Sequence, residues 1–258
     1  MSRTITLIPV HMNSYRLPGK ALLDINGKSL VRRVYENVSG VFPGDVAVVS
    51  PDIEIMDECE KFGVRAVRSG RGLPSGTDAI ADALRQMDPG GDEYDIVVDF
   101  QGDSVNVDPR VNLPLIDIVR GTGCDMATCG MKFGDEREAL DPNMVKIVMG
   151  LRPGETEGRA LYFTRAAAPY IRDPERSGIN RDYYHHIGIY VFRAESLRRV
   201  VSLPEGVLES REKLEQLRML EAGMTIRAKL IDRLKLIEEA PADINTPEEY
   251  EAAKKWIP

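Results

Sequence analysis

The chain has 258 residues, 43% of them hydrophobic, and a formal net charge of −7 at pH 7. A chain of this length and composition can bury a sizeable core, either as one large α/β domain or as two small ones. The negative charge argues against a nucleic-acid-binding protein, because such proteins need a dense positive surface to displace counterions from phosphates.

The apolar runs of the sequence are short, and none approaches the roughly 20 residues that a membrane-spanning helix needs. The amino terminus has one early arginine and a short apolar run at residues 4–9, without the cleavage site of a signal peptide. The cysteines, Cys59, Cys124 and Cys129, match no zinc or redox spacing, so we expect buried free thiols. Together these features predict a cytoplasmic protein.

Strand and helix patterns alternate over the first half of the chain. Runs of β-branched residues predict strands at residues 4–9, 45–50, 64–68, 95–101 and 124–132. Apolar residues at helical spacing predict a helix that begins after Ser29 as its N-cap, and further helices at residues 53–62, 77–87 and 111–119. This alternation predicts an α/β fold, with a mostly parallel sheet and helices on both of its faces.

The pattern changes at residues 132–192, where strands predicted at 145–149, 160–164 and 186–192 are separated by loops containing proline and glycine. We interpret this segment as a smaller subdomain or an arm. A helix is then predicted at residues 211–222, with Gly223 as its C-cap, and a strand at residues 225–230. The last helix is predicted to have Thr246 as its N-cap and Pro247 as its first residue.

The loop after the first predicted strand carries Arg16, Gly19 and Lys20. Ligands of open α/β sheets bind at the carboxyl ends of the strands, where this loop lies. Arg16 offers a planar fork of donors, Lys20 a point charge and Gly19 a close backbone approach, which together suit a triphosphate. The alternative is a surface turn with two solvated charges. No G-x-x-x-x-G-K-[ST] pattern occurs in the chain, which argues against a Walker-type ATPase.

Two aspartates are candidates for a magnesium site. Asp103 ends the run Gln101-Gly102-Asp103 at the same edge of the predicted sheet, and Asp243 precedes the last helix. Mg²⁺ in proteins takes one or two carboxylates together with substrate phosphates and water. Taken singly, Asp103 also suits a turn or a helix cap, and Asp243 also suits a loop that leads into a helix.

Eight segments of the chain share their order and spacing with one enzyme family. They are IPVHMNSYRLPGKALLDINGKSLVRRVYE from Ile8, SGTD from Ser75, QGD from Gln101, DPNMVKIV from Asp141, ALYFTRAAAPY from Ala160, HHIGIYVF from His185, LEQLRMLEAGMTI from Leu214 and ADINTPEEYE from Ala242. In these segments the chain resembles the CMP-Kdo synthetases, which are 3-deoxy-manno-octulosonate cytidylyltransferases. The similarity extends from residue 5 to about residue 252.

The resemblance implies one cytidylyltransferase domain over residues 1–258, of the nucleotidyltransferase, Rossmann-like type. Residues 132–192 would form an inserted subdomain that binds the acceptor and contacts the partner in a homodimer. The implied activity is Mg²⁺-dependent transfer of CMP from CTP to the anomeric hydroxyl of a Kdo-like acidic sugar, for surface polysaccharide or lipopolysaccharide synthesis. No protein nucleophile is needed, because such enzymes mainly position the reactants and neutralise charge.

The resemblance also implies a role for each matched residue. Arg16 and Lys20 would grip the triphosphate, and Asp103 and Asp243 would hold Mg²⁺. The implied nucleotide-binding residues are Pro9, His11, Ser14, Arg16, Lys20, Ser75, Gln101 and Asp103. The implied sugar-binding residues are Gln101, Arg165, His186, Tyr190, Glu215 and Gln216. The alternatives are a hydrogen-bonded core histidine for His186, a packed strand aromatic for Tyr190, and a solvated helix face for Glu215 and Gln216.

The chain departs from the usual family pattern at several positions. The usual Ile-Pro-Ala-Arg ends here in Val10 and His11, a usual histidine is Leu73, and the usual arginine after Ser-Gly-Thr-Asp is Ala79. The usual Gln-Gly-Asp-Glu-Pro ends in Ser104 and Val105, and the usual Ala-Thr-Asp-Asp is Val49-Ser-Pro-Asp52. We therefore expect retained chemistry with an altered acceptor or altered nucleotide contacts, and Kdo as a poor substrate.

Two other classes of function are open to test. Gly70, Gly72 and Gly76 follow a predicted strand, as in nicotinamide-dependent oxidoreductases, but the spacing of the third glycine does not fit G-x-G-x-x-G. A non-catalytic sensor of sugars or nucleotides would keep the fold and explain the departures. The joint presence of Arg16, Lys20, Asp103 and Asp243 argues against this sensor.

Overall fold

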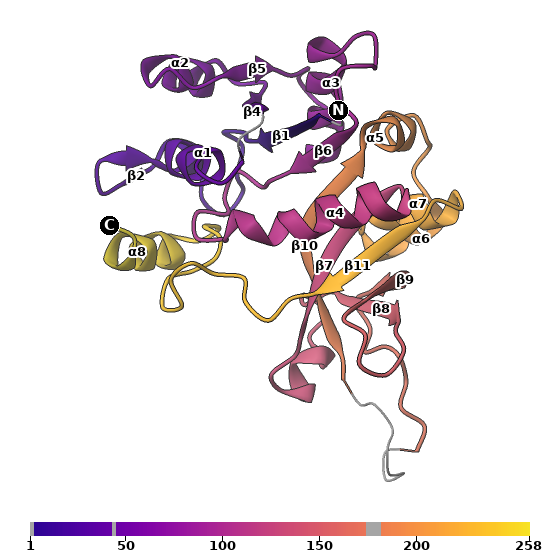
Figure 1. The fold of residues 1–258 in the computed structure, drawn as a ribbon. Helices are drawn as coiled ribbons and strands as arrows, with labels where there is room; N and C mark the ends of the chain where they lie inside the picture. Colours follow the sequence, from indigo (N-terminus) through magenta and orange to yellow (C-terminus); the bar gives the residue numbers. More distant parts are fainter. Residues whose placement is uncertain (1–2, 43–44, 174–181) are drawn as a thin grey trace. The chain divides into compact units, whose positions relative to one another are not determined.

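A computed structural model describes residues 3–42, 45–173 and 182–258. The chain forms two compact units (Figure 1). The first unit contains residues 1–113 and 234–258, and the second contains residues 114–233. The two segments of the first unit bring the carboxyl-terminal residues onto the amino-terminal fold, so residues far apart in the sequence share one core.

The first unit is built on a parallel sheet with the strand order β5-β4-β1-β6. These strands are β1 (Thr4–Pro9), β4 (Asp45–Ser50), β5 (Ala66–Arg68) and β6 (Ile96–Asp99). The helices are α1 (Leu30–Ser39), α2 (Ile53–Lys61), α3 (Gly76–Met87) and α8 (Pro247–Trp256), with 3₁₀ turns η1 (Lys20–Leu22) and η2 (Pro109–Val111) and a small hairpin of β2 (Asp24–Ile25) and β3 (Lys28–Ser29).

The strand order places helices on both faces of this sheet. The chain steps in one direction from β1 to β4 to β5 through α1 and α2, and then returns across the sheet to β6 through α3. Because parallel crossovers are right-handed, α1 and α2 cover one face and α3 covers the other. Strands covered on both faces need apolar side chains throughout, and Ile96, Val97 and Val98 of β6 are all buried.

The second unit contains a mixed sheet with the strand order β10-β7-β11-β9-β8. Its strands are β7 (Met126–Lys132), β8 (Lys146–Gly150), β9 (Glu157–Thr164), β10 (Tyr184–Arg193) and β11 (Ile226–Leu230). Its helices are α5 (Ala194–Val200), α6 (Val207–Glu212), α7 (Gln216–Glu221) and the 3₁₀ turn η3 (Glu136–Leu140), while α4 (Asn112–Thr122) carries the chain in from the first unit. Among the strand pairs formed by the described residues of this unit, only β7–β11 is parallel, and β10 also pairs with β8.

The α/β prediction is confirmed, and most of the parallel pairing lies in the first unit. The segment 132–192, predicted as a subdomain, lies within the second unit, which extends further on both sides. Cys59, Cys124 and Cys129 are buried free thiols, as expected. Within the described residues, no helix has the length and apolar character that crossing a membrane requires.

The helix predicted at residues 211–222 is wrong, because two short helices replace it. The chain leaves the helical conformation at Lys213, whose φ is +54°. The guanidinium of Arg218 in α7 donates hydrogen bonds of 2.7 and 2.6 Å to the Glu209 carboxylate in α6. One continuous helix would hold side chains nine positions apart on different turns, so this mostly buried ion pair favours the break over helix propensity.

The two predicted N-caps have different outcomes. Thr246 precedes α8, and its hydroxyl accepts a hydrogen bond from the Glu249 N–H, while the Glu249 carboxylate accepts one from the Thr246 N–H. This is a capping box, and it confirms the prediction. Ser29 precedes α1 as predicted, but its hydroxyl makes no capping hydrogen bond.

Candidate active site

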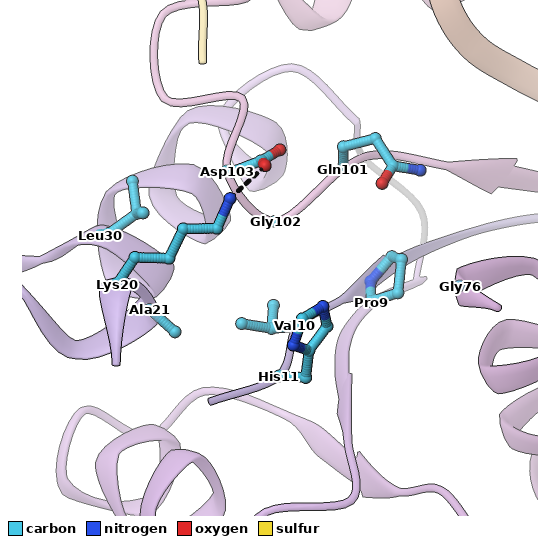
Figure 2. A pocket seen from close by; sticks show the side chains of 10 residues that line it. All are labelled: Pro9, Val10, His11, Lys20, Ala21, Leu30, Gly76, Gln101, Gly102 and Asp103. Atoms are coloured by element: carbon cyan, nitrogen blue, oxygen red, sulfur yellow. Dashed lines mark hydrogen bonds and ion pairs between the residues drawn. The ribbon is translucent and has the colours of Figure 1, made fainter. Parts of the chain in front are cut away.

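A pocket opens at the carboxyl ends of β1 and β6 in the first unit (Figure 2). Its volume is about 130 Å³. The lining residues are Pro9, Val10, His11, Lys20, Ala21, Leu30, Gly76, Gln101, Gly102 and Asp103. A second pocket of about 330 Å³ shares part of this wall and extends along Val49, Asp52, Leu73, Ser75 and Ala79. We call them the lysine pocket and the side pocket.

The loop after β1 is tied down by its backbone. Gly19 has a φ of +72°, in the left-handed region that favours glycine, and its N–H donates to the Met12 carbonyl at 3.0 Å. The Met12 N–H donates in turn to the Asp52 carboxylate at 2.7 Å. The loop therefore turns back on itself directly before Lys20 and directs this side chain into the pocket.

Lys20 bridges two parts of the first unit that are far apart in sequence. Its ammonium donates to Asp103 Oδ2 at 2.5 Å, and to the Ile244 carbonyl and Asn245 Oδ1 at 3.0 Å each. These three acceptors match the three donors of a lysine. The side chain is only 13% exposed. A solvated surface charge is therefore excluded for Lys20.

Asp103 lies on a turn that passes unusually close to β1 (Figure 2). A Cβ built on Gly102 would lie 2.7 Å from the Pro9 carbonyl oxygen and would also collide with Val10. Only glycine allows this approach, which places Asp103 beside Lys20. The Gly102 requirement is visible in the sequence only as one glycine in a short run, so sequence reasoning did not assign it a role.

Asp243 joins Asp103 at the same place. The Ile244 N–H donates to the Asp103 carbonyl at 3.1 Å, and the Ser104 hydroxyl donates to Asp243 Oδ1 at 2.6 Å. Burial raises the pKa of the Asp243 carboxyl above its usual range, and the nearby negative charge of Asp103 raises it further. The two aspartates that lie 140 positions apart in the sequence are neighbours in the fold, as the magnesium hypothesis requires.

The donor set fits a Mg²⁺ ion that is shared with a ligand. Two carboxylates repel each other, and a divalent cation between them removes that repulsion. Within the described residues, no group of three or more His, Cys, Asp or Glu side chains could hold a metal by itself. Phosphate oxygens and water would complete the coordination, which is how Mg²⁺ is usually bound at nucleotide sites.

The other residues predicted to bind the nucleotide are distributed unevenly. Pro9 and His11 line both pockets, and Gln101 lines the lysine pocket and donates to Asp99 at 3.0 Å. Ser75 lines the side pocket, although its hydroxyl also caps α3 by accepting from the Asp78 N–H. Arg16 is exposed on the loop, and neither Arg16 nor Ser14 lines either pocket. Their roles stay predictions.

Two of the residues predicted to bind the sugar, Tyr190 and Gln216, lie around His186 in the second unit. His186 Nε2 forms a hydrogen bond of 3.0 Å with the Thr128 hydroxyl. His186 Nδ1 lies 3.5 Å from the side-chain amide nitrogen of Gln216. The Tyr190 ring lies 5.7 Å from the His186 ring. Gln216 is buried, so the solvated-face alternative is wrong for it, whereas Glu215 is exposed.

His186 carries no charge at neutral pH. Burial, with a smaller contribution from the nearby His185, lowers the pKa of its imidazole to about 3. A neutral imidazole can be a donor at one nitrogen and an acceptor at the other. His186 is therefore suited to hydrogen bonding rather than to proton transfer near pH 7, whichever molecule it contacts.

Arg165 is fixed at the end of β9 by backbone carbonyls. Its guanidinium donates to the Glu212 carbonyl at 2.7 Å and to the Pro142 carbonyl at 2.9 Å. The Arg165 N–H and the Thr164 hydroxyl both donate to the Glu212 carboxylate. These contacts engage two of the five guanidinium donors and orient the others.

Comparisons with known proteins agree on one family. The sequence model of the cytidylyltransferases matches residues 5–226 of the chain. The 3-deoxy-manno-octulosonate cytidylyltransferase of Paramagnetospirillum magneticum is 42% identical over 240 residues, which are 93% of this chain and 94% of that protein. The enzyme of the same name from a Bradyrhizobium species is 41% identical over 256 residues, 99% of this chain and 98% of that protein.

The chain belongs to the 3-deoxy-manno-octulosonate cytidylyltransferase family.

Solved structures support this membership. A CMP:2-keto-3-deoxy-manno-octonic acid synthetase in complex with CTP has a TM-score of 0.84 at 32% identity, and the match covers 98% of each chain. A cytidylyltransferase from Leptospira borgpetersenii has a TM-score of 0.61 at 17% identity, covering 98% of this chain and 86% of that one. The second match shows the shared fold alone.

Sequence reasoning missed two residues of this cytidylyltransferase that contact the predicted site. Asn245 accepts a hydrogen bond from Lys20, and Ser104 donates one to Asp243. Asn245 stands within the matched segment from Ala242, and Ser104 was noted only as a departure from the usual pattern. Their partners lie more than 100 positions away, so no local pattern points to these contacts.

Proposed function

We propose that this chain transfers CMP from CTP to the anomeric hydroxyl of Kdo, or of a closely related 2-keto-3-deoxy sugar acid, and releases pyrophosphate. The observation that carries the proposal is the joining of Lys20, Asp103 and Asp243 at one strand edge in a member of this family. The relatives that cover nearly the whole chain bear the name of this activity.

In the proposed reaction, the anomeric oxygen attacks the α-phosphorus of CTP in line with the leaving group. The new O–P bond forms as the bond between the α-phosphorus and the oxygen bridging to the β-phosphorus breaks, and the hydroxyl proton is lost to solvent. Lys20 would bind phosphate oxygens with the ammonium that now contacts Asp103, and Arg16 would reach the triphosphate from the same loop. Fixed positive groups of this kind stabilise charge that develops during transfer.

Asp103 and Asp243 are the residues that would hold Mg²⁺. When bound, the ion would neutralise phosphate charge and lower the pKa of a coordinated hydroxyl. The role of the chain is to keep the two carboxylates adjacent, which the hydrogen bonds at Ile244 and Ser104 do.

The acceptor would be bound by residues of the second unit. His186 and Gln216 present a neutral hydrogen-bonding pair, and Arg165 presents guanidinium donors suited to a carboxylate. A sugar acid has hydroxyls for the first pair and a carboxylate for the second. Tyr190 and Glu215 would complete this set.

The positions at which the chain departs from the family pattern favour a change in nucleotide binding rather than in acceptor binding. His11, Leu73 and Ala79 line the side pocket, and Ser104 contacts Asp243, all within the first unit. None of them lies among the second-unit residues proposed to bind the sugar. We therefore propose Kdo as an accepted substrate, and the expectation that Kdo is a poor one becomes the alternative to be tested.

A cytoplasmic homodimer fits the same proposal. CTP is a cytoplasmic substrate, and three large apolar side chains among the described residues of 132–192 are exposed: Leu140 at 70%, Leu161 at 54% and Tyr170 at 85%. Exposed apolar groups of this kind suit a contact between subunits. Size-exclusion chromatography with light scattering measures the state directly, and a monomer would contradict the dimer.

The test is an assay of pyrophosphate release that crosses four nucleoside triphosphates with Kdo and several other ulosonic acids, in the presence of Mg²⁺. We expect CTP with Kdo to give the highest kcat/KM. A higher kcat/KM for another acid by roughly 10- to 100-fold, the effect of one lost buried hydrogen bond, would favour the altered-acceptor alternative. Binding of CTP without release of pyrophosphate from any pair would favour a sensor.

A further inference from the structure

Ser104 and Asp243 lie on two loops that are joined by backbone hydrogen bonds. The Ile244 N–H donates to the Asp103 carbonyl, and the Asn106 N–H donates to the Ala242 carbonyl, each at 3.1 Å. Ser104 and Asp243 therefore lie between two backbone hydrogen bonds that join the two loops. The backbone positions of Ser104 and Asp243 are set by these bonds, and only the side-chain torsions of Asp243 remain to be fixed.

The Ser104 hydroxyl fixes those torsions. It is 7% exposed and donates to Asp243 Oδ1 at 2.6 Å, a distance typical of a hydroxyl bound to a charged carboxylate. Within the described residues, this is the one hydrogen bond made by the Asp243 carboxylate. The lone pairs of Asp243 Oδ2 are therefore available to a cation. The carboxylate cannot rotate without losing the hydrogen bond from Ser104.

We propose that Ser104 is a positioning residue that holds Asp243 in the orientation needed to bind the divalent cation of the reaction. The inference rests on the proposed function, in which Asp103 and Asp243 share that cation. Ser104 would act through its hydrogen bond to Asp243 rather than as a ligand of the cation. It acts by keeping one carboxylate oxygen engaged so that the other faces the shared site.

The position of Ser104 argues against a purely structural role. A buried serine without a specific partner would lose little when replaced by alanine, whereas this hydroxyl bonds the residue assigned to the metal. Groups that orient metal ligands typically change metal affinity or activity by about 10- to 100-fold when removed. Ser104→Ala is therefore expected to weaken binding of the cation while leaving the fold intact.

The chain offers a matched control in the second unit. The Ser196 hydroxyl donates to Asp125 Oδ1 at 2.7 Å, and Ser196 is 4% exposed. Ser196→Ala removes the same kind of serine–aspartate hydrogen bond from a carboxylate with no proposed role in metal binding. Any loss common to both variants is an effect on stability, and a loss confined to Ser104→Ala is an effect on the cation.

The experiment titrates Mn²⁺ into the full-length protein saturated with CTP, without acceptor, and follows water-proton relaxation, which separates Mn²⁺ on the protein from Mn²⁺ on free CTP. We expect Ser104→Ala to raise the Mn²⁺ dissociation constant by about tenfold or more. Ser104→Thr, which keeps the hydroxyl, should stay within about threefold of the unaltered protein. Ser104→Cys, similar in size but a weak donor, should resemble Ser104→Ala. Ser196→Ala should leave the constant unchanged.

A dissociation constant for Ser104→Ala and Ser104→Cys within twofold of the unaltered protein would overturn the inference, as would an equal weakening in Ser196→Ala. Absence of Mn²⁺ binding to the unaltered complex would overturn it together with the metal assignment. The proposed function fails separately, by the absence of pyrophosphate release with any acid. In that case the comparison of Mn²⁺ affinities still decides the role of Ser104.

Discussion

Lys20 is proposed to bind the nucleotide, and its hydrogen bonds also connect segments of the first unit that are far apart in the sequence. Its ammonium contacts Asp103, the Ile244 carbonyl and Asn245. Phosphate oxygens would have to replace some of these acceptors. The positive charge beside Asp103 and Asp243 also compensates their negative charge until a divalent cation is present.

Lys20→Ala is expected to lower turnover by orders of magnitude, because a fixed positive charge on the triphosphate is lost. Pyrophosphate release measures the turnover, and circular dichroism with a thermal melt measures the fold. Lys28→Ala is the control, since Lys28 is a half-exposed lysine of the same unit that pairs with Glu36. Activity near that of the unaltered protein in Lys20→Ala would remove Lys20 from the mechanism.

The two aspartates are expected to act as a unit. Asp103→Asn and Asp243→Asn should each raise the Mg²⁺ concentration for half-maximal activity and lower the maximal rate. The double variant should lose much less than the product of the two losses, because groups that act on one ion are coupled.

The measurement is the steady-state rate over a series of Mg²⁺ concentrations for the unaltered protein, the two single variants and the double variant. Multiplicative losses would place Asp103 and Asp243 in separate roles. An unchanged Mg²⁺ dependence in Asp243→Asn would reduce Asp243 to a residue of the loop that leads into α8.

At the scale of elements, the start of α8 determines where the carboxyl-terminal half of the site lies. The Glu249 carboxylate accepts from the N–H groups of both Asn245 and Thr246, and Asn245 in turn accepts from Lys20. The helix cap and the site are therefore connected through consecutive residues. Local sequence signals predict this element well, because a threonine, a proline and a glutamate at the right spacing satisfy the first turn by themselves.

Thr246→Ala is expected to lower the free energy of unfolding by about 1 kcal/mol, because the Glu249 N–H loses its capping acceptor. Thr246→Ser keeps the acceptor and should leave the free energy of unfolding nearly unchanged. Urea denaturation of the three proteins measures the difference. Equal stability of the alanine and serine variants would contradict a role for the hydroxyl.

At the scale of the whole molecule, the structure predicts acid lability. The unfolded chain protonates a histidine near its usual pKa of 6.5, whereas burial keeps the pKa of His186 near 3 in the folded state. Between these values the unfolded state binds more protons, so stability falls as the pH falls. Asp45, Asp125 and Glu209 have lowered pKa values and add losses of the same sign at lower pH.

His186→Gln should therefore flatten the decline in unfolding free energy between pH 6.5 and about 5, which lies above the range in which the carboxylates with lowered pKa values become protonated. Some slope should remain, because the pKa of His185 is also lowered by burial. Denaturation curves at several pH values measure both slopes. Parallel declines in the two proteins would show that His186 is charged in the folded state.

Sequence alone determined the α/β class, the family, the alternation of elements in the first unit and the candidate residues Lys20, Asp103 and Asp243. These follow from local periodicity, from turn and cap residues, and from the order of matched segments, all of which are written along the chain. Which of these residues act on the nucleotide and the metal remains a prediction, but the first loop and the two aspartate segments are adjacent in the fold.

Only the tertiary structure decided the contacts made over long separations. The break at Lys213 follows from the ion pair between Glu209 and Arg218, and the hydrogen bond between Ser104 and Asp243 spans 139 positions. Likewise, the antiparallel pairs of the second unit join strands that are not all consecutive in the sequence, so local patterns do not predict them. Each depends on the free energy of two distant groups in contact, which exceeds the small local preferences that a sequence pattern reports.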